Sequence, residues 1–407
     1  MVSFTTNNKK PMRIPYALSV YDEKEERAVL EVLRSHKTGI GERTEKFESM
    51  VAKMFGKKHG IMVNSGSSAN LLAYEILRLK KGSQVVTPAL TFSTTISPLL
   101  QKELKPVLID VEEGTYLPSS NVVKDSINAR TSALMIPNLL GNVPDMKKLQ
   151  EIKSQHSIYY VEDSCDTLGA TFSGKPTGTY SDISITSFYG SHIITAGGGG
   201  GMICVNNNTW DTKARILRGW GRSSAVDESE DIEKRFKVKL DGIPYDSKYL
   251  FKEVGYNFLP LEISSAFGIE QLKKLKYFSV RRNQNFSILN KFFSDYKDFF
   301  VLPKQLEETK TNWLAFPLTI KPKAPFSRAD IVKYLEKQNV QTRPIFTGNV
   351  IRQPAFKGNL NIILKKDYPV ADDITRNGFV LGCNQGLDDT HMTRLTNVLS
   401  SFLSRFG

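Results

Sequence analysis

Short apolar runs alternate with helical stretches along the first half of this chain, and this alternation limits the fold more than any other feature. Because such alternation is typical of βαβ units, the sequence predicts an α/β fold with a mostly parallel sheet. Parallel strands are buried on both faces, which agrees with runs that are apolar throughout. The expected strands are residues 60–63, 84–87, 105–109, 133–136, 158–161 and 183–186. The expected helices are residues 22–33, 44–55, 68–79, 92–101, 120–127 and 146–154.

The second half of the chain has a different pattern. Residues 223–234 are polar and acidic without clear periodicity, and they predict a long surface loop. Apolar spacing then predicts a long helix at residues 261–286, a strand at 313–320 and a helix at 328–338.

The length of the chain favours two domains. With 407 residues it exceeds the size at which a single core usually stops growing. We expect a large domain at residues 20–260 and a smaller C-terminal α/β domain at residues 261–407, which residues 1–19 would join.

Charge and composition exclude several classes of protein. The net charge is +13, but the lysines occur in short scattered pairs with no basic run interleaved with aromatics. This pattern indicates a solvated surface or steering of a small anionic substrate, and no nucleic-acid partner. No window approaches eighteen apolar residues and the first twenty residues lack a signal-peptide core, so we expect a cytoplasmic protein without membrane contact. Cys165, Cys204 and Cys383 are widely separated, which predicts no metal site.

The first motif that carries chemistry is Asn-Ser-Gly-Ser-Ser-Ala-Asn at residues 64–70. It follows an expected strand and opens an expected helix. Gly66 permits a tight turn, and Ser67 with the free amides of the helix N-terminus would favour a phosphate. A plain capped helix is an equally good interpretation, because serine is a preferred N-cap residue.

The second motif, Val-Glu-Asp-Ser-Cys-Asp at residues 161–166, ends another expected strand. Ligands of open α/β sheets bind at the carboxyl ends of strands, so Asp163 would face them and could keep a pyridinium nitrogen protonated. Alternatively, Asp163 or Asp166 caps the following segment. Phe92 could stack on a planar ring, although an isolated aromatic residue belongs more often to the core.

The third motif is Ser-Phe-Tyr-Gly-Ser-His at residues 187–192, which leads to five glycines at residues 197–201. Its key residue is His192. A lysine at this point would hold pyridoxal phosphate as a Schiff base. An imidazole cannot form that bond, but it can move protons near neutral pH, since its unperturbed pKa is about 6.5.

These motifs occur in the order that a fold-type I vitamin B6 enzyme requires. Over residues 20–406 the chain resembles the DegT family of sugar aminotransferases, and within it the branch of nucleotide-sugar 3-dehydrases in which histidine replaces the lysine. The most specific segments are residues 65–70, 162–166, 187–192, 255–257 and 347–354.

The resemblance implies a fold-type I PLP-dependent transferase architecture, a homodimer and a role for each matching residue. Gly66, Ser67 and Ser187 would cradle the cofactor phosphate, and Asn257 would reach the phosphate from a partner subunit. Phe92 would cover the cofactor ring and Asp163 would pair with the ring nitrogen. His192 would be the catalytic base. Asn349 and Arg352 would lie near the substrate, because a nucleotide diphosphate needs cationic partners.

The implied reaction is removal of the C3 hydroxyl group from a nucleotide-linked 4-keto-6-deoxyhexose, in deoxysugar and lipopolysaccharide O-antigen biosynthesis. The cofactor would rest as pyridoxamine 5'-phosphate and be recharged from pyridoxal 5'-phosphate by L-glutamate. A related branch uses a [2Fe–2S] cluster and a reductase instead. Cys165 matches the first cluster cysteine, but residues 223–231 contain none of the others, so we expect no iron-sulfur cluster.

Three alternatives stay open at this point. The chain could be a sugar aminotransferase whose lysine was replaced, or an electron-coupled 3-dehydrase that needs a reductase, since residues 245–249 and 353–356 resemble that branch more closely. It could also be a non-catalytic protein that binds nucleotide sugars. The choice among GDP, CDP and TDP is equally open.

Overall fold

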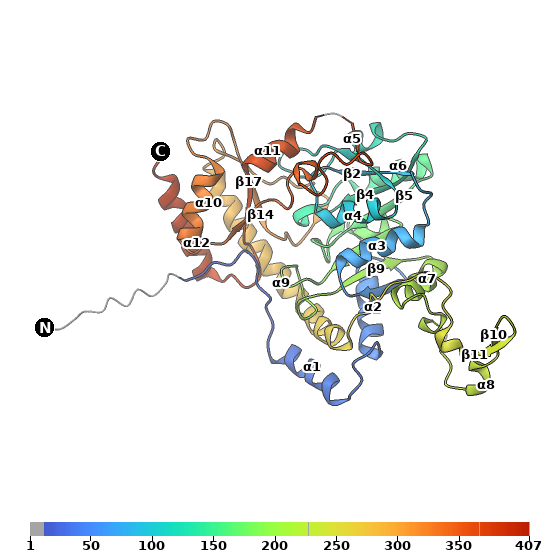
Figure 1. Ribbon diagram of the computed structural model, residues 1–407. Coiled ribbons are helices and arrows are strands. Elements are labelled where there is room, and N and C mark those ends of the chain that lie inside the picture. The colour runs from blue at the N-terminus through green and yellow to red at the C-terminus, as the bar shows by residue number, and fades with distance from the viewer. Residues whose placement is uncertain (1–11, 227, 366, 407) are drawn as a thin grey trace.

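An eight-stranded sheet forms the centre of the molecule (Figure 1). The computed structural model describes residues 12–226, 228–365 and 367–406. In sheet order the strands are β1 (His59–Val63), β9 (Gly201–Val205), β8 (Ile183–Ser187), β5 (Tyr159–Asp163), β4 (Thr131–Pro137), β2 (Gln84–Pro88), β3 (Lys105–Ile109) and β16 (Ile363–Leu364). Strands β8 to β16 run parallel, and β9 is antiparallel to both of its neighbours.

This sheet confirms the predicted α/β fold with mostly parallel strands. All six expected strands are present, with ends that differ from the prediction by at most two residues. Strand β9 was not predicted. It begins at Gly201, where a Cβ atom would lie only 2.3 Å from the backbone oxygen of Ser65. The chains pass so closely here that the strand must begin inside a glycine run, and glycine weakens the sequence pattern of a strand.

Helices cover both faces of the sheet (Figure 1). One face packs against α3 and α7 through residues such as Leu72 and Leu217, and the other packs against α5 and α6 through Val123 and Leu149. The bounds are α1 (Glu23–Arg34), α2 (Glu42–Met54), α3 (Gly66–Leu77), α4 (Ser93–Gln101), α5 (Ser120–Asp125), α6 (Met146–His156) and α7 (Asn208–Arg218). The six helices expected in this half of the chain are therefore confirmed.

A 33-residue helix, α9 (Glu262–Ser294), leads from the large sheet to a second sheet. It continues beyond the predicted end because Leu289 and Phe293 are fully buried and extend its apolar side. The second sheet is antiparallel, with the order β12 (Phe300–Val301), β14 (Phe316–Ile320), β17 (Gly378–Leu381) and β15 (Thr342–Arg343). Three helices pack beside it, α10 (Arg328–Lys337), α11 (Pro369–Asn377) and α12 (Asp389–Leu403).

The two predicted domains are closely joined. Strand β16 comes from the C-terminal part of the chain but pairs with β3 at the edge of the large sheet. One buried core contains Leu108 of the large sheet together with Leu318 of the second sheet. At the other end of the chain, Ile14 forms a bridge with Val340, beside the second sheet. Residues 1–11 lie outside the described part of the chain, so the assignment of residues 1–19 to the smaller domain stays a prediction. The boundary at residue 260 stays a prediction.

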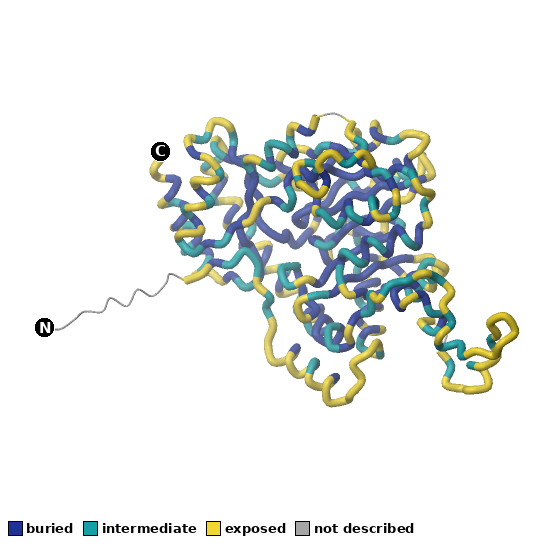
Figure 2. The backbone as a smooth tube through the Cα atoms, viewed as in Figure 1, coloured by how far each residue is buried: buried dark blue, intermediate teal, exposed yellow. Residues whose placement is uncertain are grey.

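An arm projects from the body of the molecule where a long loop was expected (Figures 1 and 2). It contains η3 (Ser223–Ala225), α8 (Ile232–Arg235), η4 (Ser247–Tyr249) and a hairpin of β10 (Val238–Leu240) and β11 (Ile243–Tyr245). The hairpin turn, Asp241-Gly242, has positive φ at both residues, which is the geometry that Asp-Gly favours in tight hairpins. The loop prediction was thus wrong for α8 and η3.

Several short elements complete the described fold. A three-stranded sheet consists of β13 (Thr309–Lys310), β6 (Thr171–Phe172) and β7 (Lys175–Pro176), and further single turns are η1 (Leu139–Gly141), η2 (Thr177–Thr179) and η5 (Val350–Arg352). Across the described ranges, no helix is long and apolar enough to cross a membrane.

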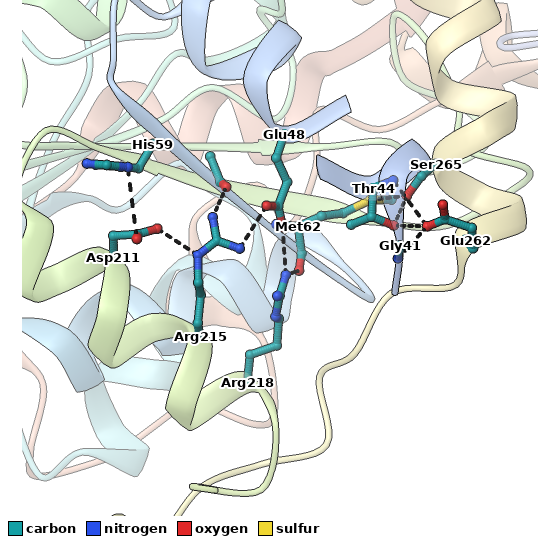
Figure 3. A network of polar contacts seen from close by, with 11 residues as sticks. Gly41, Thr44, Glu48, His59, Met62, Asp211, Arg215, Arg218, Glu262 and Ser265 are labelled. Atoms are coloured by element: carbon teal, nitrogen blue, oxygen red, sulfur yellow. Dashed lines mark hydrogen bonds and ion pairs between the residues drawn. The ribbon is translucent and has the colours of Figure 1, made fainter. Parts of the chain in front are cut away.

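A polar network fixes the elements beneath the first motif (Figure 3). The carboxylate of Glu48 accepts hydrogen bonds from Arg215 and Arg218, at 2.8 and 2.7 Å, and Arg218 also donates to the carbonyl of Met62. The backbone N–H of Phe258 then donates to the carbonyl of Arg218, and the backbone N–H of Asn64 donates to the carbonyl of Phe258. The turn before α3 is therefore held against residues 256–258.

Candidate active site

The carboxyl ends of β5 and β8 and the N-terminus of α3 enclose a cavity of about 360 Å³, which we call the inner chamber. Six residues that the sequence singled out line it together: Gly66, Ser67, Phe92, Asp163, Ser187 and His192. They come from four separate parts of the chain. Their convergence follows from the parallel sheet, which brings the ends of its strands to one edge.

One end of the inner chamber is built for an anion. Ser65 is the N-cap of α3, since its hydroxyl accepts a hydrogen bond from the backbone of Ser68 at 3.1 Å. The capped-helix interpretation is therefore correct, and the same helix N-terminus also opens into the chamber. A Cβ atom on Gly66 would lie 2.8 Å from Cβ of Ser187, so glycine is required where helix and strand meet.

Asp163 stands at the end of β5 with only 7% of its surface exposed. Its carboxylate accepts hydrogen bonds from the side chain of Asn70 at 3.0 Å and from the backbone of Cys165 at 3.2 Å. The second bond is the local capping that the sequence offered as an alternative. Both bonds hold the carboxylate in place on the chamber wall, where a cationic ring nitrogen would be stabilised.

His192 lies in the turn after β8, and burial lowers its pKa to about 4. The backbone of Ser187 and the carboxylate of Asp163 oppose this lowering of the pKa, and the buried cation of Arg282 adds to it. Atom Nδ1 of His192 is buried and has no hydrogen-bond partner among the described residues. The imidazole is therefore neutral at physiological pH, which is the state that a proton acceptor requires.

Asp166 is the titratable neighbour of this imidazole. Its Oδ1 lies 3.9 Å from Nε2 of His192, and its Oδ2 accepts a hydrogen bond from the backbone of Leu140 at 2.9 Å. Burial, with a smaller contribution from Asp163, raises the pKa of Asp166 to about 7. A proton acceptor and a carboxyl group that titrates near neutrality thus share one wall of the inner chamber. Sequence analysis assigned Asp166 at most a capping role.

The turn that carries His192 is tied to distant parts of the chain. Gln385 donates to the carbonyl of Ile193 at 3.3 Å, and the buried guanidinium of Arg282 donates to Gln385 at 2.7 Å. On the other side, Ser19 donates to the carbonyl of Gly190 at 2.8 Å. These contacts join the N-terminal segment, α9 and the residues after β17 to the turn, so the position of His192 depends on the whole molecule.

Sequence analysis missed the residues that close the chamber. Tyr16, Leu314 and Phe346 line it, and Phe346 meets the ring of Phe92 edge to face at 6.1 Å. Burial raises the pKa of Tyr16, and Asp166 adds to this effect. No local pattern could have identified these residues, because each approaches the site from a remote segment.

Three other residues of the prediction lie outside the inner chamber wall. Asn257 is exposed, beside the arm, and makes a bridge with Gly219. Asn349 is fully buried, and its side chain donates to Asp372 at 2.9 Å, while Arg352 donates to the same carboxylate from Nε. Both residues thus anchor their loop to α11. Their predicted position near a substrate stays a prediction.

A second cavity of about 660 Å³, which we call the outer chamber, adjoins the inner one. The two share Tyr16, Phe92 and Phe346 in their walls. The loop predicted to lie near the substrate does reach this chamber, through Thr347 and Gln353.

The three cysteines lie in different parts of the fold. Cys165 lines the inner chamber. Cys204 lies in β9 and is part of a buried core, and Cys383 belongs to the core that contains the second sheet. All three thiols are free, and burial raises the pKa of each of them.

Comparisons with known proteins show the family of the chain. A model of the DegT/DnrJ/EryC1/StrS aminotransferase family matches residues 20–400. The chain is 35% identical to dTDP-4-dehydro-2,6-dideoxy-D-glucose 3-dehydratase of Saccharopolyspora spinosa, over 95% of this chain and 86% of that protein. It is 32% identical to GDP-4-keto-6-deoxy-D-mannose 3-dehydratase of Yersinia pseudotuberculosis, over 95% of this chain and 98% of that protein.

Among solved structures, the chain is similar to a GDP-4-keto-6-deoxymannose-3-dehydratase with a trapped PLP-glutamate geminal diamine. The TM-score is 0.85 and the sequences are 30% identical, over 95% of this chain and all of that chain. These similarities confirm the expected fold-type I architecture.

Proposed function

Because this chain belongs to the DegT/DnrJ/EryC1/StrS aminotransferase family, we propose that it binds pyridoxal or pyridoxamine phosphate in the inner chamber and removes the C3 hydroxyl group of a nucleotide-linked 4-keto-6-deoxyhexose. One observation carries the proposal. A neutral, partly buried histidine stands where the chamber would need a lysine for a Schiff base, and no lysine occurs among the described residues of its wall.

The chamber fits the cofactor at each end. The N-terminus of α3 with Ser67 and Ser187 would hold the phosphate, Asp163 would hold the ring nitrogen in its protonated form, and Phe92 would lie against the ring. Cavity residues Asn70 and Thr91 each carry a buried oxygen without a partner in the described chain, as expected of a wall that receives a polar ligand. When bound, the cofactor supplies the amine and an electron sink.

The protein's own contribution is proton transfer and positioning. With the cofactor bound, the imidazole of His192 would act as the base that accepts a proton beside the cofactor and then as the acid that returns it to the departing C3 oxygen, which would leave as water. Asp166, 3.9 Å away, exchanges a proton with the imidazole and so adjusts its state between the two transfers. The buried walls keep bulk water away from these steps.

The cofactor's amine has to be restored after each turnover, and we propose L-glutamate as its source. A related 3-dehydratase was solved with a PLP-glutamate adduct, which supports this choice. The overall exchange balances: the sugar loses one oxygen atom, glutamate becomes 2-oxoglutarate, and ammonia is released. No iron-sulfur cluster enters the proposed cycle.

Incubation with GDP-, CDP- and TDP-linked 4-keto-6-deoxyhexoses and glutamate tests the proposal. We expect a product that is one oxygen atom lighter than one of these substrates, together with ammonia. An amino sugar would instead identify an aminotransferase, and a requirement for a reductase would identify the electron-coupled reaction. A protein that binds the sugars but never interconverts the two cofactor forms would be non-catalytic.

The same proposal includes a homodimer in which Asn257 reaches the partner's phosphate site. Its exposure outside its own inner chamber supports this role. A mixture of Asn257→Ala and His192→Asn chains tests it. If Asn257 acts across the interface, a mixed dimer has one working site, which combines His192 of one chain with Asn257 of the other. If Asn257 acts within its own subunit, every site in the mixture lacks one of the two residues and the mixture stays inactive.

A further inference from the structure

The outer chamber has a distinctive distribution of charge. Most of its wall is apolar, with Phe92, Phe346 and Phe356 among its residues. Arg343 is the one lysine or arginine among the described residues that line either chamber. The inner chamber instead contains two carboxyl groups, those of Asp163 and Asp166. The inner chamber thus offers an anion the N-terminus of α3, whereas among the described lining residues a cationic side chain is available only in the outer chamber.

The guanidinium of Arg343 is available for such a group. Within the described ranges it forms no ion pair, and its one hydrogen bond runs from Nη1 to the neighbouring carbonyl of Thr342 at 2.7 Å. It also stands 5.9 Å from the ring centre of Tyr16, which belongs to both chambers. The remaining nitrogens of its planar fork are free to donate, and this geometry matches phosphate oxygens.

The backbone that carries Arg343 is rigid. The residue lies in β15 and pairs with Val380 of β17, while its neighbour Thr342 is buried and donates to Glu336 from both its backbone, at 2.6 Å, and its hydroxyl, at 2.8 Å. The backbone of Arg343 is therefore fixed while its guanidinium is exposed, so the residue needs little reorganisation to bind a ligand.

We propose that Arg343 binds the diphosphate of the nucleotide-linked substrate, with the base against the apolar wall of the outer chamber and the sugar directed toward His192. This inference rests on the proposed function and adds the orientation of the substrate. It also replaces Arg352, whose guanidinium is engaged by Asp372, as the cationic partner of the diphosphate.

Steady-state kinetics of Arg343→Met test the inference. We expect KM for the nucleotide sugar to rise about tenfold or more with a smaller change in kcat, because a charge-assisted bidentate contact to the non-reacting part of the substrate is lost. Conversion of the cofactor by glutamate alone should keep its rate, since glutamate does not carry a diphosphate. Arg343→Lys should recover part of the loss. Arg27→Met, on the exposed side of α1, serves as the matched control.

Binding of GDP, CDP and TDP to the holoenzyme separates this inference from the proposed function. Loss of nucleotide diphosphate binding in Arg343→Met, with binding of the bare nucleosides unchanged, supports the role of Arg343 even if no sugar is dehydrated. An unchanged KM and unchanged diphosphate binding would overturn it while leaving the dehydratase proposal in place. A KM increase in Arg352→Met but not in Arg343→Met would overturn it as well.

Discussion

The Nε2 atom of His192 lies 3.9 Å from Oδ1 of Asp166 in the wall of the inner chamber, where Asp166 is buried and His192 is partly buried. Burial moves their pKa values in opposite directions, to about 4 for the imidazole and about 7 for the carboxyl group. Near pH 6 the folded protein therefore holds one proton on Asp166 and none on His192. In the unfolded chain the same proton would reside on the histidine.

This exchange predicts how Asp166→Asn changes stability with pH. The folded pKa of Asp166 is raised above its unfolded value of 3.8, so the folded state holds an extra proton between about pH 4 and 7 and becomes less stable as pH rises through that range. Because asparagine does not titrate, the Asp166→Asn variant does not lose stability in this way as pH rises. Its free energy of unfolding relative to the parent should increase from pH 4 to pH 7, by up to about 4 kcal/mol, in denaturant titrations of the cofactor-free protein. A difference that does not vary with pH would contradict the raised pKa.

Replacement of His192 by Asn should abolish proton transfer while leaving cofactor binding intact. Dehydration and the conversion of the cofactor by glutamate should both slow by about 10²- to 10⁴-fold, since one base serves both. The cofactor's absorbance after gel filtration measures its retention. His156→Asn, on the exposed end of α6, is the matched control and should keep full activity. Loss of dehydration alone would assign the glutamate step to another base.

Gly66→Ala should weaken cofactor binding selectively. The added methyl group would lie 2.8 Å from Cβ of Ser187 and 3.0 Å from Sγ of Cys165, so the helix N-terminus has to move away from the strand. We expect the dissociation constant for pyridoxal phosphate to rise by about tenfold or more, as measured by fluorescence titration. In Gly39→Ala, where a Cβ atom has no neighbour within 4 Å, the constant should not change. Equal affinities would show that the phosphate is held elsewhere.

Glu262→Ala should destabilise the protein without affecting the chemistry directly. Its buried carboxylate accepts hydrogen bonds from the backbones of Gly41, Arg43 and Thr44 at the start of α2. Figure 3 shows Gly41 and Thr44 beside Glu262. Removing it leaves one buried and two partly buried donors unpaired, which costs about 2–4 kcal/mol. The midpoint of thermal unfolding should fall clearly. Glu26→Ala, on the exposed face of α1, should leave it within error, and an equal fall in both variants would refute the role of Glu262.

Local patterns predicted the strands and helices well because the strands at the centre of the large sheet are buried along most of their length and contain short apolar runs. They failed where a close approach of two segments decided the structure. Strand β9 begins at Gly201 because the backbone of Ser65 passes beside it, and this proximity leaves no periodic signal. The arm was partly missed for a related reason, since α8 contains no buried residue that would create an amphipathic pattern.

The sequence by itself determined the parallel sheet, the order of its motifs and the identity of His192, Asp163 and Ser187 as residues of one site. Periodicity and strand ends are local properties, and a parallel sheet gathers strand ends at one edge. Only the tertiary structure decided that Tyr16 and Arg343 join this site, that Asp166 faces the imidazole, and that Arg352 is held by Asp372. These relationships connect residues far apart in the chain through packing and burial, and burial is also what moves the pKa values on which the proposed chemistry depends.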